Sequence, residues 1–146
     1  MNIGLVGVGN MGGAMALRLL DAGHAVHVCD IDAARVQALV ASGARAHRSA
    51  AALASACELA IVVVVDAAQT AEVLFGHEGV MAAATLPVAV MLCPTIAPAD
   101  TEAFAARLQS GGVGAFDAPM SGGPLRARDG SMSLMVAASD AFFERY

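Results

Sequence analysis

The feature that most constrains the fold is an apolar segment that runs directly into a glycine-rich turn. Residues 2–12 read NIGLVGVGNMG, a strand pattern followed by the spacing Gly-x-Gly-x-x-Gly. Gly7 permits the tight turn out of the strand, Gly9 lets the backbone approach a pyrophosphate, and Gly12 allows the next helix to pack closely on the sheet. That helix points its N-terminal N–H groups and its dipole at the phosphates. The sequence therefore predicts a dinucleotide-binding site.

A carboxylate stands where such a site needs one. Asp30 ends the next apolar run, 18 positions after Gly12. It can accept hydrogen bonds from the hydroxyls of the adenosine ribose, and its charge would repel a 2′-phosphate, so we expect NAD rather than NADP. The candidate residues for cofactor binding lie in the turn, at the end of the second strand and at two later strand ends: Gly7, Val8, Gly9, Asn10, Met11, Gly12, Asp30, Ile31, Val65, Asp66 and Thr95.

The rest of the chain alternates apolar runs with helical patterns, which predicts a Rossmann-type, doubly wound α/β fold with a mostly parallel sheet and helices on both faces. The expected strands are Ile3–Val6, Ala25–Cys29, Ala44–His47, Leu59–Val64, Val88–Leu92, Ala115–Asp117 and Ser133–Val136. The expected helices are Met11–Ala22, Ala33–Ala41, Ala50–Ser55, Gln69–Phe75 and Asp100–Ser110. No repeat or linker interrupts this pattern, so residues 1–146 are expected to form one dinucleotide-binding domain.

The composition excludes several classes of protein. A net charge of −5 without an arginine cluster argues against a nucleic-acid partner. The longest apolar run, Leu59–Val65, is far shorter than the ~20 residues that cross a bilayer, so no membrane partner is expected. Without a basic leader the chain is expected to be cytoplasmic. Its three cysteines, at 29, 57 and 93, lack metal-ligand spacing and are expected to be buried, reduced thiols. The four histidines show no such spacing either, so no metal site is assigned.

Ligands of such a sheet lie at the carboxyl ends of its strands. The segment Val64–Ala67 ends a strand and could pass beneath the cofactor, although Asp66 is equally compatible with an ordinary helix cap. Thr95 follows the next strand and could donate a hydrogen bond to the nicotinamide ribose or carboxamide. A lone threonine in a loop is more often a turn former, so both interpretations stay open.

The last strand end carries an unusual segment, Ser121-Gly122-Gly123. A hydroxyl followed by consecutive backbone N–H groups can form a small anion-binding concavity, which suits a substrate carboxylate. A glycine-proline turn without a ligand is the equally weighted alternative. Arg126 and Arg128 follow shortly after, and solvated surface positions are the favoured interpretation over a role in binding an acidic substrate.

Three segments together resemble the β-hydroxyacid dehydrogenase family, which includes 3-hydroxyisobutyrate, tartronate semialdehyde and L-threonate dehydrogenases. They are residues 4–12, residues 95–98 (TIAP) and residues 117–123 (DAPMSGG), and residues 66–69 look nearest to the L-threonate branch. The resemblance implies hydride transfer between a small hydroxy acid and a nicotinamide cofactor. It also implies that Thr95 contacts the cofactor and that Ser121, Gly122 and Gly123 bind the substrate carboxylate.

All eight basic residues of the chain, counting lysine and arginine together, are arginines. In the family a lysine handles the proton, on a helix that leads to a second, all-helical domain and that would follow residue 146. We therefore assign no catalytic residue within the chain and expect residues 1–146 alone to be inactive. The surface around Ser133–Val136 and 141–143, which that domain would cover, is expected to be apolar and to cause self-association as a homo-oligomer.

Two other functions stay open at this point. A dinucleotide-sensing module without turnover would need no lysine, although it would have little use for a substrate segment. An imine reductase-like relative would also lack the lysine, but such proteins resemble NADP users and Asp30 disfavours that cofactor.

Overall fold

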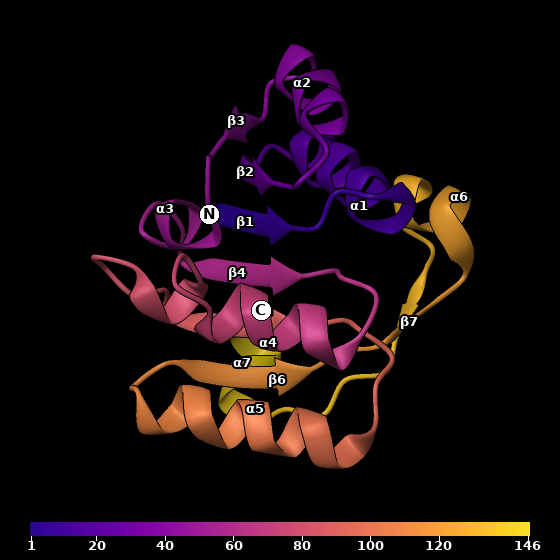
Figure 1. Cartoon of the computed structure of the whole chain (residues 1–146). Coiled ribbons are helices and arrows are strands. Elements are labelled where there is room, and N and C mark those ends of the chain that lie inside the picture. The colour runs from indigo at the N-terminus through magenta and orange to yellow at the C-terminus, as the bar shows by residue number, and fades with distance from the viewer.

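Six parallel strands form the central sheet, in the order β3-β2-β1-β4-β5-β6. The computed structural model describes residues 1–146 and confirms the predicted fold class (Figure 1). The strands are β1 (Asn2–Val6), β2 (Ala25–Cys29), β3 (Arg45–Ala46), β4 (Leu59–Val62), β5 (Ala89–Leu92) and β6 (Gly114–Asp117). The strand order reverses between β1 and β4, so the turn that ends β1 lies where doubly wound sheets bind their ligands.

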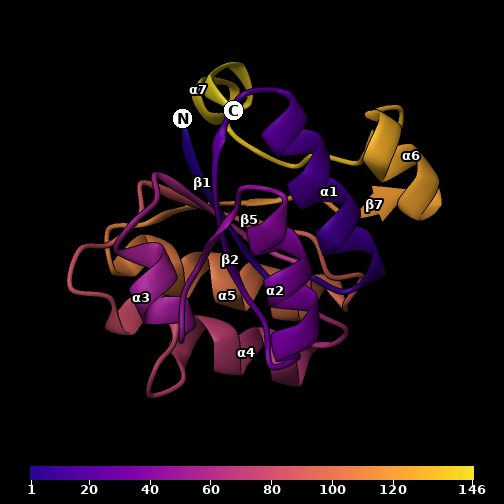
Figure 2. The ribbon, with the colours of Figure 1, turned by 90° about the horizontal axis from the view of Figure 1, so that it is seen from above.

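Helices cover both faces of this sheet. They are α1 (Asn10–Asp21), α2 (Ala33–Ala41), α3 (Ala50–Ala54), α4 (Ala67–Phe75) and α5 (Pro98–Ser110), with a short 3₁₀ turn, η1 (Val80–Ala82). Leu5 and Ile61 pack on the side of α1 and α2, whereas Val6 and Val62 pack on the side of α3, α4 and α5 (Figure 2). Because β4 is buried on both faces, its sequence is continuously apolar rather than alternating.

The helix ends follow local side-chain chemistry. The carboxylates of Asp32 and Asp66 accept hydrogen bonds from the first turns of α2 and α4. Gly23 and Gly43, just past α1 and α2, have φ values of 83° and 106°, the left-handed conformation that ends a helix. Pro98 opens α5, where its missing N–H costs nothing. The expected helices are therefore confirmed, with ends within two residues of those expected.

The last part of the chain corrects the sequence-based prediction. The expected strand Ser133–Val136 is wrong in length and partner, because β8 (Ser133–Leu134) pairs antiparallel with β7 (Met120–Ser121) in a separate two-stranded sheet. Two helices were not predicted, α6 (Gly123–Asp129) and α7 (Asp140–Arg145). The backbones of Asp117 and Ala137 exchange two hydrogen bonds in an isolated antiparallel bridge. This bridge attaches the segment after β8 to the end of the edge strand β6.

The three cysteines are free thiols. Cys29 and Cys93 are buried as predicted, whereas Cys57 is only partly buried, a correction to the expectation. Burial raises the pKa of Cys93 to about 12 and that of Cys57 to about 11. Both thiols are therefore protonated at neutral pH and are poor nucleophiles.

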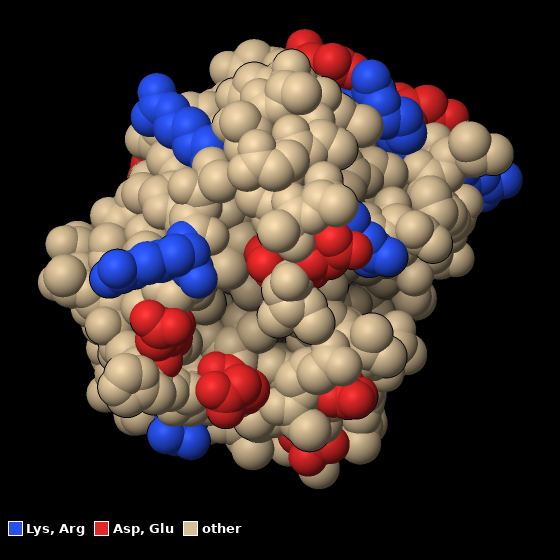
Figure 3. All heavy atoms as spheres, turned by 45° about the horizontal axis from the view of Figure 1, so that its top comes forward, with Lys and Arg blue, Asp and Glu red and all other residues tan.

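Acidic and basic side chains are interspersed on the face of the molecule that Figure 3 shows. None of the helices has the length and apolar character that crossing a membrane requires.

Candidate functional site

The glycine turn joins three elements backbone to backbone. Gly7 has a φ of 90°, and a Cβ added there would lie 2.2 Å from the carbonyl oxygen of Val63, just after β4. A Cβ on Gly12 would lie 2.0 Å from the carbonyl oxygen of Gly7. Both distances are too short for any side chain, so this packing of β1, α1 and β4 requires glycine at the two positions.

The start of α1 offers a set of free hydrogen-bond donors. No side chain caps this helix, and no group of the chain accepts the backbone N–H of Gly9, Asn10, Met11 or Gly12. Four N–H groups at the positive end of a helix dipole are the donors that a phosphate binds. The donor set at this turn therefore fits the pyrophosphate of a dinucleotide.

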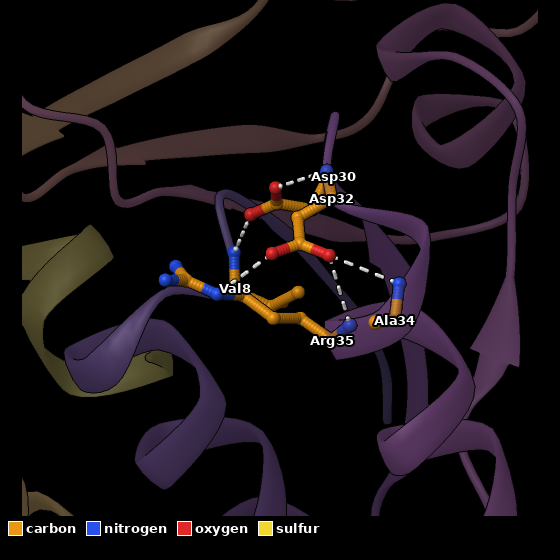
Figure 4. A network of polar contacts seen from close by, with 5 residues as sticks. All are labelled: Val8, Asp30, Asp32, Ala34 and Arg35. Carbon is orange, nitrogen blue, oxygen red and sulfur yellow. Dashed lines mark hydrogen bonds and ion pairs between the residues drawn. The ribbon is translucent and has the colours of Figure 1, made fainter.

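Asp30 ties the glycine turn to the connection between β2 and α2. One carboxylate oxygen accepts from the N–H of Val8 at 2.6 Å, and the other accepts from the N–H of Asp32 at 2.8 Å (Figure 4). Each oxygen keeps a further lone pair with which it can accept a ribose hydroxyl. Ile31, the next residue, is fully exposed.

Arg35, which the sequence-based assignment did not include, also lies beside the glycine turn. It lies in the first turn of α2, and its Nε is 3.2 Å from a carboxylate oxygen of Asp32. A Cβ on Gly9 would lie 3.0 Å from Arg35 Nη1, so the guanidinium reaches the glycine turn. The signal that was available is the three-residue spacing from Asp32, which places both side chains on one face of a helix start.

The next two strand ends lie at the same edge, because β1, β4 and β5 are parallel. Val65 and Thr95 are exposed there. The Asp66 carboxylate accepts from the N–H of Gln69 at 2.8 Å, which favours the helix-cap interpretation of its side chain. The residues after β4 that come next to the turn are Val63 and Val64, which lie close to Gly7.

The segment Ser121–Gly123 lies beyond β6. Gly122 and Gly123 have φ values of 128° and 74°, and no group of the chain accepts their N–H groups. Ser121 is exposed beside them. In Figure 1, β7 and α6 lie at the edge to which the strand arrows point, and α6 packs against α1. A hydroxyl and two unpaired N–H donors therefore stand at the same edge of the sheet as the glycine turn.

The structure separates the two arginines that follow this segment. Arg128 forms an ion pair with Asp21 at the C-terminal end of α1, so it has a structural partner. The side chain of Arg126 lies against Gly122 instead, because a Cβ on Gly122 would be 2.9 Å from Arg126 Cδ. Arg126 is thus the arginine that adjoins the Ser121–Gly123 segment.

Comparison with known protein families identifies the chain. Residues 2–146 match the profile of the NAD binding domain of 6-phosphogluconate dehydrogenase. The chain belongs to this family.

The relatives are oxidoreductases of small hydroxy acids. The chain is 36% identical over 145 residues to 2-hydroxy-3-oxopropionate reductase of Escherichia coli K12, covering 99% of the chain and 49% of that protein. It is 40% identical over 136 residues to L-threonate dehydrogenase of Cupriavidus necator, covering 93% of the chain and 46% of that protein. These matches confirm the resemblance to the β-hydroxyacid dehydrogenases.

A solved structure shows the same fold. The crystal structure of 3-hydroxyisobutyrate dehydrogenase from Salmonella typhimurium superimposes with a TM-score of 0.92 and 36% sequence identity, covering 99% of this chain and 50% of that one. The chain thus spans about half the length of the relatives it matches. It corresponds to the NAD-binding half of 3-hydroxyisobutyrate dehydrogenase-like proteins.

Proposed function

We propose that the chain is the cofactor-binding half of an oxidoreductase that moves a hydride between a small hydroxy acid, of the 3-hydroxyisobutyrate or L-threonate type, and a nicotinamide cofactor. The observation that carries this proposal is the presence of two unpaired donor sets at one sheet edge. One set is the four N–H groups at the start of α1, and the other is the Ser121–Gly123 segment. The first suits a pyrophosphate and the second a carboxylate.

The bound cofactor would supply the hydride acceptor, and the chain would hold both reactants in place. The N–H groups of Gly9 to Gly12 would bind the pyrophosphate, and Asp30 would accept the ribose hydroxyls. The Ser121 hydroxyl and the following two N–H groups would orient the substrate carboxylate. The other residues that we assign to cofactor contacts are Gly7, Val8, Ile31, Val65, Asp66 and Thr95.

We propose NAD as the preferred cofactor. The Asp30 carboxylate lies beside the glycine turn, bonded to the N–H of Val8, where the adenosine ribose of a bound dinucleotide would lie. A free 2′-hydroxyl can donate to this carboxylate, whereas a 2′-phosphate would be repelled by it.

The proton that leaves the substrate hydroxyl needs a general base from outside residues 1–146. The chain contains no lysine, and the relatives that it matches are about twice as long. We propose that a lysine from an all-helical domain completes the site, and that residues 1–146 alone bind cofactor without turnover.

Calorimetric titration of this chain with NAD and NADP tests the proposal. NAD should bind more tightly than NADP, and assays with 3-hydroxyisobutyrate, L-threonate and D-glycerate should show no turnover. If neither nucleotide binds, the cofactor assignment is contradicted. Tighter binding of NADP would contradict the preference for NAD. Robust turnover would contradict the need for an external lysine.

The sensing and imine reductase alternatives can be distinguished from the dehydrogenase by activity assays of a longer protein that also contains the proposed all-helical domain. Oxidation of a hydroxy acid supports the dehydrogenase, reduction of a cyclic imine supports the imine reductase, and NAD binding without either activity supports a sensor. Ser121→Ala offers a matched control, since it should weaken hydroxy-acid binding while NAD affinity stays unchanged.

We also propose self-association through exposed apolar side chains of the C-terminal segment, those of Leu134, Met135, Val136 and Phe143. A cytoplasmic location is proposed as well, because its reducing conditions would keep the three free cysteines as thiols.

A further inference from the structure

Asp32 does two things at the start of α2. One of its carboxylate oxygens caps the helix, accepting from the N–H groups of Ala34 at 3.0 Å and Arg35 at 3.4 Å. Its other oxygen lies 3.2 Å from Arg35 Nε. The cap needs only an acceptor, whereas the second contact is an ion pair that fixes the direction of a guanidinium (Figure 4).

The far end of that guanidinium lies at the cofactor turn. Arg35 Nη1 is 3.0 Å from the position that a Cβ on Gly9 would take, and the Asp30 carboxylate is bonded to the neighbouring N–H of Val8. The guanidinium therefore lies beside the glycine turn, where the proposed dinucleotide would bind. An arginine placed near the adenosine ribose is the group that dinucleotide-binding domains use to accommodate a 2′-phosphate.

We propose that Asp32 is a specificity-determining residue, because its ion pair with Arg35 withholds this guanidinium from a 2′-phosphate. The inference rests on the proposed dinucleotide binding and deepens it. The connection between β2 and α2 carries two carboxylates, Asp30 and Asp32, and one guanidinium, that of Arg35, so its net charge is negative. Without Asp32 the charges of Asp30 and Arg35 balance, and Arg35 has its full set of donors available for a phosphate.

Asp30 is a poor place to test cofactor choice. Both of its carboxylate oxygens already accept backbone N–H groups, one from the glycine turn and one from Asp32. Asp30→Ala would leave these donors unpaired and disturb the turn, so it should weaken the binding of both cofactors. Asp32→Asn is cleaner, because the asparagine oxygen keeps the helix cap while the negative charge is lost.

The experiment is calorimetric titration of Asp32→Asn with NAD and NADP. We expect NADP affinity to rise by roughly tenfold, the scale of one additional charge-assisted hydrogen bond, while NAD affinity changes by less than about threefold. Arg35→Gln alone should not raise NADP affinity and should leave NAD affinity nearly unchanged, because the wild-type guanidinium is already held by Asp32. The double variant Asp32→Asn/Arg35→Gln should lose the gain of the single Asp32→Asn variant.

Asp21→Asn is the matched control. It also removes one negative charge and one aspartate–arginine ion pair, and its pair is as exposed as the one at Asp32, with side-chain exposures of 46% and 50% against 52% and 46%. It lies at the other end of α1 from the glycine turn, so it should leave the NAD to NADP preference unchanged.

Three results would overturn the proposal. The NADP gain could persist in the double variant, which would mean that Asp32 repels the phosphate directly. It could appear equally in Asp21→Asn, which would make it an effect of net charge, or it could be absent from Asp32→Asn altogether. A wild-type chain that binds neither nucleotide would instead refute the proposed function, so the two failures are distinguishable.

Discussion

The main sheet with its glycine turn and the C-terminal residues 120–146 are held in place by different means. In β1 and β2, buried side chains pack against helices on both faces of the sheet, and Leu5 and Val28 are fully buried. In residues 120–146, α7 contains no buried residue, and Met135 and Phe143 are exposed. The first region draws its stability from its own core, whereas the second depends on the surfaces to which it docks.

Residues 120–146 pack on the rest of the chain through aromatic side chains of α7 and through α6. Phe142 packs on the edge strand, since a Cβ on Gly114 would lie 2.0 Å from its ring. The rings of Phe116 and Tyr146 are stacked with centroids 6.1 Å apart, and α6 packs on α1. The C-terminal segment is thus held by its packing on α1 and on the edge strand rather than by a core of its own, and changes in the two regions should have unequal effects.

The largest effect is expected at Gly12. Gly12→Ala places a methyl group against the Gly7 carbonyl oxygen, so it should destabilise the fold by about 3 kcal/mol and abolish NAD binding. Urea unfolding and calorimetric titration measure both. Gly13→Ala is the control, because its Cβ would lie 3.3 Å from the Val8 carbonyl oxygen and should change stability by less than about 1 kcal/mol.

A paired truncation compares the two regions directly. Leu5→Ala should cost about 3 kcal/mol of unfolding free energy, because a fully buried leucine leaves a cavity. Phe143→Ala should stay within about 0.5 kcal/mol, because 67% of that side chain is exposed. Equal costs in urea unfolding would show that the C-terminal segment shares the main core.

Acid should weaken the cofactor half through a pair of histidines. His27, buried on β2, lies 2.8 Å from His47, measured between Nδ1 and Nε2. Burial lowers the pKa of both rings, and His47 and Arg45 lower the pKa of His27 further. The unfolded chain then binds more protons below its ordinary histidine pKa of 6.5, so stability is full above that pH and falls as the pH drops below it.

Thermal unfolding measured between pH 8 and pH 5 follows this loss of stability. His47→Gln should flatten the dependence, while His77→Gln, an exposed control, should leave it unchanged. A pH profile that His47→Gln does not alter would rule out the pair as its source.

The smallest effect on the unfolding free energy is expected at the exposed apolar side chains of the C-terminal segment. Changes there should instead alter self-association. Met135→Ser with Phe143→Ser should reduce self-association while the unfolding free energy changes by about 0.5 kcal/mol or less. Sedimentation velocity over a range of concentrations measures the association. A wild-type chain that stays monomeric at high concentration would contradict the proposed interface.

The parts that the sequence predicted well are those with local signals. The glycine turn, the helix-ending Gly23 and Gly43, and the buried strand β4 depend on backbone conformation or on runs of apolar residues. The helices α6 and α7 were missed because they are short and have no strong periodic pattern. Their stability comes from packing on α1 and on β6, which no local pattern reports.

By itself the sequence determined that this chain folds as a doubly wound sheet with a dinucleotide turn, because glycine spacing and apolar periodicity act through the backbone near each residue. Only the tertiary structure decided which charged groups meet. It bonded Asp30 to Val8, brought the Arg35 guanidinium to Gly9 and left Arg126 beside Gly122. These contacts depend on how the first turn of each helix is set against a neighbouring strand end, which spacing along the chain does not encode.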